Sequence, residues 1–229
     1  MDRSSEGAVE RQILGDLRPV RPLARPWKRA LGVCGVGALL ACGVYLGFGV
    51  RHDARLLGRG VLWGLSGLQA AYGVILIVSA LRVSIPGRTL ARQFAAGLLL
   101  AGVGLVLTIT YATWLAHASL VPIGRQYLYW SICFRTPVLL GLPPLLLTLL
   151  LAFRAYPTRP ALTGALAGLG AGLLSDGSWR TYCEVSDPGH VLTSHVASVV
   201  LLTAGGLLLA LLFARRRERG RDLSKWGRE

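Results

Sequence analysis

The sequence predicts an all-α integral membrane protein with six transmembrane helices, both termini in the cytoplasm and no separate soluble domain. The first observation is composition, since 53% of the 229 residues are hydrophobic and only 16% are charged, with a mean hydropathy of +0.53. Soluble domains carry about 25% charged residues. The second observation is that the apolar residues form six long windows. The third is that nearly all Lys and Arg residues lie between and beyond these windows.

Each window is long enough for a helix that crosses a bilayer. A hydrocarbon core about 30 Å thick requires roughly 20 apolar residues in a helix. Strands of membrane barrels are shorter, and apolar and polar residues alternate along them, so continuous apolar runs favour helices. The predicted spans are approximately residues 30–50, 61–81, 94–116, 127–153, 161–179 and 191–213.

The fourth and fifth spans have features that predict how they pack. The fourth contains three prolines, which predict a kink or a break because proline removes a helical hydrogen bond. The fifth is the least apolar, and its glycines recur at every fourth residue, which predicts a smooth ridge for close helix packing. These residues are Pro137, Pro143 and Pro144 in the fourth span and Gly164, Gly168 and Gly172 in the fifth.

The distribution of basic residues predicts the orientation. Nineteen Lys and Arg residues lie in the two terminal segments and in the second and fourth connections, whereas five lie in the other connections. Because cytoplasmic segments carry the excess of positive charge, the chain divides into a cytoplasmic arm (1–29), a six-helix transmembrane domain (30–213) and a basic cytoplasmic tail (214–229). We expect the tail to contact anionic membrane lipid, and binding of a partner protein is the alternative. Direct binding of nucleic acid is not expected, because it needs basic residues on a soluble face.

Two of the four cysteines are candidates for chemistry. Cys34 and Cys42 lie in the first span, about 12 Å apart along the helix, which is too far for a disulfide. Cys133 and Cys183 both lie at the predicted outer side, as does His195. If the last three spans pack together, these residues could bind a thiophilic metal, or the two thiols could form a reversible disulfide. A purely structural disulfide, or two unpaired packing cysteines, is the alternative.

Charged residues near the span ends are further candidates for a role in the structure or the site. Arg135 follows Cys133 by two residues and could lower the pKa of that thiol. Asp176 and Arg180 are four residues apart at the outer end of the fifth span, which predicts an ion pair. The predicted spans otherwise contain no charged residue. Proton-coupled transporters carry ionisable residues near the midplane of the membrane, so this absence counts against a transport function.

The cytoplasmic arm has the pattern of a docking segment. Its apolar residues Val9, Ile13, Leu14 and Leu17 lie at helical spacing, and two prolines then favour an extended segment. Such an arm could dock in a groove of a partner protein. It could equally lie on the lipid surface, and the residues alone leave both interpretations open.

Several motifs together resemble a known family. They are ILGDLRPVRPL in the arm, RHDARL after the first span and IPG after the second, followed by SICFRTPVLLGLPPLLL, AYPTRPALTGALAGLGAGLL and YCEVSDPGHVLTSH. In this order they resemble the NrsF-type membrane anti-sigma factors, which are negative regulators of the extracytoplasmic-function sigma factor SigF. The resemblance covers nearly the whole chain. The segment from Ser175 to Arg180 is more polar than expected of the family.

The resemblance implies an anti-sigma factor of the bacterial inner membrane that sequesters an extracytoplasmic-function sigma factor. It implies that Cys133 and Cys183 are sensor thiols for oxidative or heavy-metal stress, and His195 matches the family's histidine after the second cysteine. No cofactor is required on this interpretation, although a thiophilic metal ion could be the signal. The implied sigma-binding arm comprises Ile13, Leu14, Asp16, Leu17, Arg18, Pro19, Val20, Arg21, Pro22 and Leu23.

Two other classes of function compete with this interpretation. A small six-helix transporter or channel for a thiophilic metal or other solute is the main alternative, because a kinked fourth span and a glycine-rich fifth would permit a cavity. A membrane thiol oxidoreductase is disfavoured, since such enzymes use a vicinal reactive pair and the chain has no CxxC motif. We therefore expect no enzyme activity and no catalytic residue.

Overall fold

The computed structural model describes residues 23–116 and 123–226, and within them the chain is helical with no strand. The all-α prediction is therefore confirmed for this part of the chain. Two π-helical segments, η1 (Gly60–Leu65) and η2 (Val191–Val196), lead into the helices α4 and α9. The helices are α2 (Pro26–Phe48), α3 (Ala54–Leu57), α4 (Ser66–Val83), α5 (Arg92–Ala116), α6 (Ile123–Phe153), α7 (Pro160–Trp179), α8 (Pro188–His190) and α9 (Ala197–Trp226).

Within the part of the chain that the structure describes, five helical segments are long and apolar enough to cross a membrane, which is compatible with a membrane protein. They coincide with the first, second, third, fourth and sixth predicted spans. The fifth predicted span is the helix α7, whose 20 residues are less apolar and are almost entirely buried by other helices. The five segments are Pro26–Phe48, Gly60–Val83, Arg92–Ala116, Tyr129–Phe153 and Pro188–Arg217.

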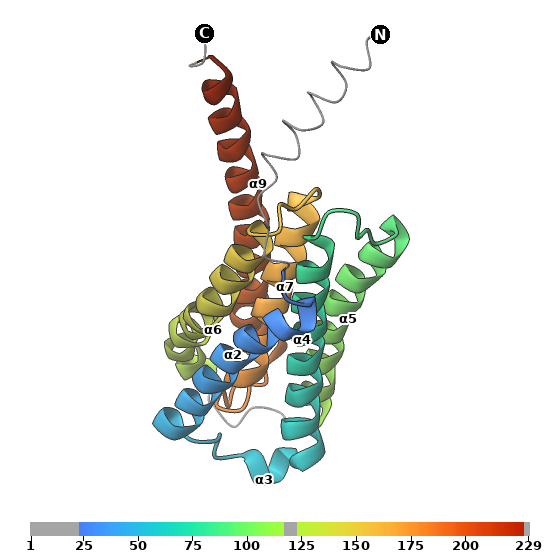
Figure 1. Cartoon of the computed structure of the whole chain (residues 1–229). Helices are drawn as coiled ribbons and strands as arrows, with labels where there is room; N and C mark the ends of the chain where they lie inside the picture. The colour runs from blue at the N-terminus through green and yellow to red at the C-terminus, as the bar shows by residue number, and fades with distance from the viewer. Residues whose placement is uncertain (1–22, 117–122, 227–229) are drawn as a thin grey trace, which may run out of the picture.

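The helix α7 forms the centre of the bundle and packs chiefly against α4 and α9 (Figure 1). Glycine permits this close approach, as predicted. A Cβ atom on Gly164 would lie 2.4 Å from the carbonyl oxygen of Gly206, and one on Gly168 would lie 2.4 Å from that of Leu202. On the opposite face, a Cβ on Gly170 would lie 2.8 Å from the carbonyl oxygen of Gly73. The backbones of α9 and α4 therefore occupy the space beside these glycines.

The helix α6 runs as one element through Pro137, Pro143 and Pro144. The helix therefore has no break there, and the kink that the prolines also predicted stays a prediction. Each proline removes only one backbone hydrogen bond, and packing against neighbouring helices holds the segment helical. Because Pro137 has no N–H, the carbonyl of Cys133, four residues earlier, lacks its usual helical donor.

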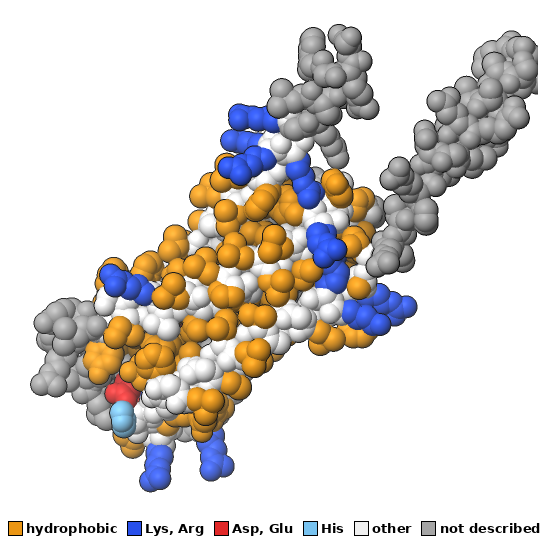
Figure 2. Space-filling model, turned by 60° about the vertical axis from the view of Figure 1, so that its left-hand side comes forward, with side chains coloured by type: hydrophobic (Ala, Val, Ile, Leu, Met, Phe, Trp, Pro, Cys, Tyr) orange, Lys and Arg blue, Asp and Glu red, His pale blue; other side chains and the backbone are white. Residues whose placement is uncertain are grey.

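The connections gather at two opposite ends of the bundle (Figure 1). The connections 49–59 and 180–187 lie at one end, whereas the connections 84–91 and 154–159 and the end of α9 lie at the other. Figure 2 shows hydrophobic side chains across the middle of one face, with Lys and Arg gathered toward its ends. This is the distribution that a bilayer-spanning bundle requires.

The basic tail continues α9 as a helix to Trp226. Near its start, the guanidinium of Arg217 lies 4.4 Å from the ring centroid of Tyr156 and 5.5 Å from that of Phe153. These cation–π contacts attach the first part of the tail to the connection between α6 and α7. The predicted sigma-binding residues from Ile13 to Pro22 lie outside the described residues, and Leu23 is exposed.

Candidate functional site

Cys133 and Cys183 lie side by side, although fifty residues separate them in the chain. Cys133 belongs to α6, and Cys183 belongs to the connection between α7 and α8. Their Sγ atoms are 3.3 Å apart, and both residues are buried. A disulfide bond is about 2.05 Å long, so these are two free thiols in contact that a small movement could join. The contact with Cys133, together with burial, raises the pKa of the Cys183 thiol.

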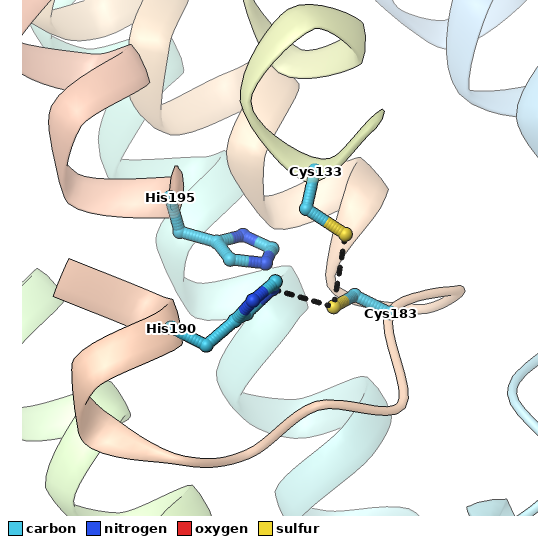
Figure 3. Close-up of side chains that lie close together, drawn as sticks. All are labelled: Cys133, Cys183, His190 and His195. Atoms are coloured by element: carbon cyan, nitrogen blue, oxygen red, sulfur yellow. Dashed lines mark hydrogen bonds between the residues drawn. The ribbon is translucent and has the colours of Figure 1, made fainter. Parts of the chain in front are cut away.

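Two histidines lie beside the thiols (Figure 3). The Nε2 atom of His190 is 3.6 Å from the Sγ of Cys183, and the ring centroids of His190 and His195 are 5.7 Å apart. All four residues are buried, and their donor atoms lie within 4.8 Å of one another. The structure thus brings together the three residues suggested by the sequence, Cys133, Cys183 and His195, and adds His190.

The backbone around His190 explains why the sequence did not predict its role. The side chain of Asp187 accepts hydrogen bonds from the backbone N–H groups of Gly189 and His190, and Pro188 occupies the first helical position. These residues begin a turn that continues as the π-helical segment η2. Side chains five residues apart in an α-helix point about 140° away from each other, whereas the wider i→i+5 turn of a π-helix places them closer together. The pair His190 and His195 therefore converges only because this segment is π-helical.

Asp176 fixes the orientation of His195. Its Oδ1 atom is 2.6 Å from the Nδ1 of His195, and its Oδ2 accepts hydrogen bonds from Arg180 Nε at 2.9 Å and Gln69 Nε2 at 2.7 Å. The predicted ion pair between Asp176 and Arg180 is thus confirmed. Since Asp176 is fully buried, its charge requires these partners. With Nδ1 bound to the carboxylate, His195 has only Nε2 left for another ligand.

Aromatic and apolar side chains enclose the thiols. Cys133 and Cys183 belong to one buried cluster with Val44, Trp179 and Val185, and the ring of Phe48 packs edge-on against that of Trp179 at 5.2 Å. A cavity of about 20 Å³ adjoins the site, and its lining includes Cys183 and His195 together with Arg51 and Arg180. A volume of this size holds about one water molecule. The thiols are therefore shielded by packed side chains, with room for about one water molecule beside them.

The connection 49–59 covers the site and is bonded to the connection that carries Cys183. Arg51 pairs with Asp53 at 2.5 Å and also donates to Ser186 Oγ at 3.0 Å. The backbone N–H of Arg51 donates to the carbonyl oxygen of Thr181 at 3.0 Å. His52 and Glu184 form a further ion pair at the surface. The end of α2 is therefore fixed to the segment that positions Cys183.

The remaining sequence candidates lie away from the thiols. Arg135 is exposed, and Cys133 is fully buried, because residues two apart on a helix point in nearly opposite directions. Cys34 is partly buried and Cys42 is exposed, both as free thiols on α2.

Comparison with known proteins gives one match. A family model described as "NrsF: Negative regulator of sigma F" matches residues 14–215. No curated protein and no solved structure matches the chain. The matched range contains all four residues of the thiol and histidine cluster. It also contains the predicted sigma-binding arm except for its first residue, Ile13.

Proposed function

The chain belongs to the NrsF family of negative regulators of sigma F, and on this basis we propose that it is an inner-membrane anti-sigma factor for an extracytoplasmic-function sigma factor. It holds the sigma factor at the cytoplasmic face of the membrane. It releases the sigma factor when oxidative or heavy-metal stress reaches Cys133 and Cys183. A sigma factor is the partner that family membership implies. To this the proposal adds the membrane orientation, the sigma-binding arm and the sensing chemistry.

In this proposal α7 also crosses the membrane, as the fifth of six spans, and both termini are cytoplasmic. Two observations support it. The connections that carry the basic excess and the end of α9 lie at one end of the bundle, and the connection 180–187, which carries Cys183, lies at the other (Figure 1). The lower hydropathy of α7 is tolerable because its residues contact other helices rather than lipid. The thiols then face the periplasm, which is an oxidising compartment.

The observation that carries the sensing role is the 3.3 Å contact between the Sγ atoms of Cys133 and Cys183. A hydroperoxide can oxidise the pair: the two thiols lose two electrons and two protons, one S–S bond forms, and the peroxide O–O bond is reduced to water and an alcohol or a second water. The bond would draw α6 toward the connection 180–187. Because interiors are tightly packed, such a movement must be taken up by neighbouring elements.

A continuous set of contacts leads from the thiols toward the arm. The connection that carries Cys183 is bonded to Arg51, which lies three residues after the end of α2. The helix α2 begins at Pro26, three residues after the proposed sigma-binding segment 13–23. Coupling of about 1–3 kcal/mol between the two sites would change the affinity for the sigma factor roughly 5- to 150-fold. In the same proposal the basic tail contacts anionic lipid.

The test is capture of the cognate sigma factor by the full chain in nanodiscs, before and after treatment with peroxide or Cd²⁺. We expect release from wild type and retention by the Cys133→Ser/Cys183→Ser double variant. The Cys34→Ser/Cys42→Ser double variant is the matched control and should behave as wild type. Equal release from wild type and from the Cys133→Ser/Cys183→Ser variant would show that the thiols are not the sensor.

A second experiment tests the arm. Removal of residues 1–23 should abolish capture of the sigma factor, while the remaining bundle still elutes as a folded species in size-exclusion chromatography. Retained capture by this truncated chain would place the binding surface on the tail or on a connection instead.

A further inference from the structure

We propose that Cys133, Cys183, His190 and His195 form a four-coordinate Cys₂His₂ site for one thiophilic divalent cation, of the Zn²⁺ or Cd²⁺ type. The inference deepens the proposed function, on which it rests only for the consequence that metal binding releases the sigma factor. The site itself is argued from its donor atoms, the orientation of its histidines and its charge balance.

The donor atoms have the spacing of a tetrahedral site. Metal–sulfur bonds of about 2.3 Å and metal–nitrogen bonds of about 2.0–2.1 Å separate tetrahedral donors by about 3.3–3.8 Å. The Sγ atoms here are 3.3 Å apart, the Cys183 Sγ and His190 Nε2 are 3.6 Å apart, and all four donors lie within 4.8 Å of one another. Small side-chain rotations would bring them around one ion. Two sulfur and two nitrogen donors in this geometry select Zn²⁺ or Cd²⁺ over harder cations such as Mg²⁺ and Ca²⁺.

The contact between Asp176 and His195 is the outer contact that metal-binding histidines usually make. Such a histidine generally donates its second ring N–H to a carboxylate, which fixes the ring and strengthens the ligand. Here the Oδ1 of Asp176 lies 2.6 Å from the Nδ1 of His195 and leaves Nε2 for the ion. Redox sensing by two thiols alone does not require a histidine oriented in this way. The metal site accounts for both histidines and for the buried carboxylate.

Charge balance also supports a divalent ion. Binding would release one proton from each thiol, so two thiolates would neutralise the two positive charges of the cation. Asp176 is already neutralised by Arg180, to which it is bonded at 2.9 Å. The site would thus have no net charge, which a buried location favours. A monovalent or trivalent ion would leave an uncompensated charge.

The metal and the disulfide exclude each other. Thiolates that coordinate an ion are not free to form an S–S bond, and a disulfide removes both sulfur ligands. Oxidants and thiophilic metals would therefore compete for the same pair. Oxidation should expel the ion, and a bound ion should slow oxidation.

The decisive experiment measures Cd²⁺ binding by the reduced, chelator-treated full chain in detergent, without any sigma factor. We expect one ion per chain, release of two protons, a thiolate-to-cadmium charge-transfer band and X-ray absorption showing two sulfur and two nitrogen ligands. His190→Ala and His195→Ala should each weaken binding by at least about 100-fold, and Asp176→Asn by about 10- to 100-fold. His52→Ala is the matched control and should bind as wild type, because the His52 side chain is 96% exposed.

The ligand count from X-ray absorption on wild type does not depend on the folding of any variant. Two sulfur ligands with no nitrogen, or equal affinity in His190→Ala and wild type, would overturn the four-ligand site. If the four-ligand site is overturned in this way but peroxide still releases the sigma factor, the proposed function stands. Tight four-ligand binding without any release of the sigma factor would instead contradict the proposed function and leave the metal site standing.

Discussion

The carboxylate of Asp176 lies 2.6 Å from the imidazole of His195, although the two residues belong to different helical segments and are nineteen positions apart. The same carboxylate also binds Arg180 and Gln69. One buried acid therefore links α7 to α4 and to η2, directly beside the two thiols. Its removal should affect both the stability of the bundle and the arrangement of the site.

Asp176→Asn should destabilise the fold strongly. The substitution leaves Arg180 buried without its counter-charge, and breaking a buried pair in this way costs about 3–5 kcal/mol. We expect a clear fall in the thermal unfolding midpoint of the detergent-solubilised chain. Glu184→Gln serves as the control, since its partner His52 is exposed, and surface pairs contribute little. Equal midpoints for the two variants would contradict the structural role of Asp176.

Substitution by alanine should change the unfolding midpoint differently at two adjacent glycines of α9. A Cβ atom on Gly206 would lie 2.5 Å from the backbone oxygen of Gly164, whereas one on Gly205 would meet no atom within 4 Å. Gly206→Ala should therefore separate α9 from α7 and lower the unfolding midpoint by several degrees. Gly205→Ala should leave it unchanged or raise it, because alanine favours the helix by about 1 kcal/mol. An unchanged midpoint in Gly206→Ala would show that close packing of α7 and α9 is not required.

Arg51→Gln should loosen the segment that carries Cys183. Arg51 bonds to Asp53, to Ser186 and to the carbonyl oxygen of Glu184, and glutamine can retain only part of this network. We expect Cys183 to react faster with a small alkylating reagent, because the connection opens more often. Arg55→Gln is the matched control, since Arg55 is exposed in the same connection. If Cys183 reacts with the alkylating reagent at the same rate in Arg51→Gln as in wild type, Arg51 does not take part in the proposed path from Cys183 to α2.

The orientation can be read with single cysteines placed at the two ends of the bundle. His52 and Arg88 are both exposed and lie in connections at opposite ends. In a background in which the four native cysteines are replaced by serine, His52→Cys should be labelled in intact cells by a thiol reagent that does not cross the inner membrane. Arg88→Cys should be labelled only after the membrane is opened. The reverse pattern would invert the proposed topology.

Properties that depend on local spacing were predictable. Long apolar windows predict helices wherever they occur, and five of the six predicted spans coincide with segments able to cross a membrane. The glycine ridge on α7 and the ion pair between Asp176 and Arg180 follow from four-residue spacing within one helix. Spacing alone did not decide between a kink and a break at the prolines of α6. The helix continues through them because neighbouring helices support it where backbone hydrogen bonds are missing.

The candidate site depends on packing between segments that are distant in the chain. The sequence could indicate that Cys133, Cys183 and His195 share one end of the molecule, but their contact distances follow from how α6, α7 and η2 pack. His190 was missed because helical periodicity points it away from His195, and only the π-helical turn brings the two rings together. By itself, then, the sequence determined the helices, their apolar character and the distribution of charge, since these depend on composition and short-range spacing. Only the tertiary structure decided which buried polar groups meet, because that depends on how the helices pack and on how each buried charge finds its partners.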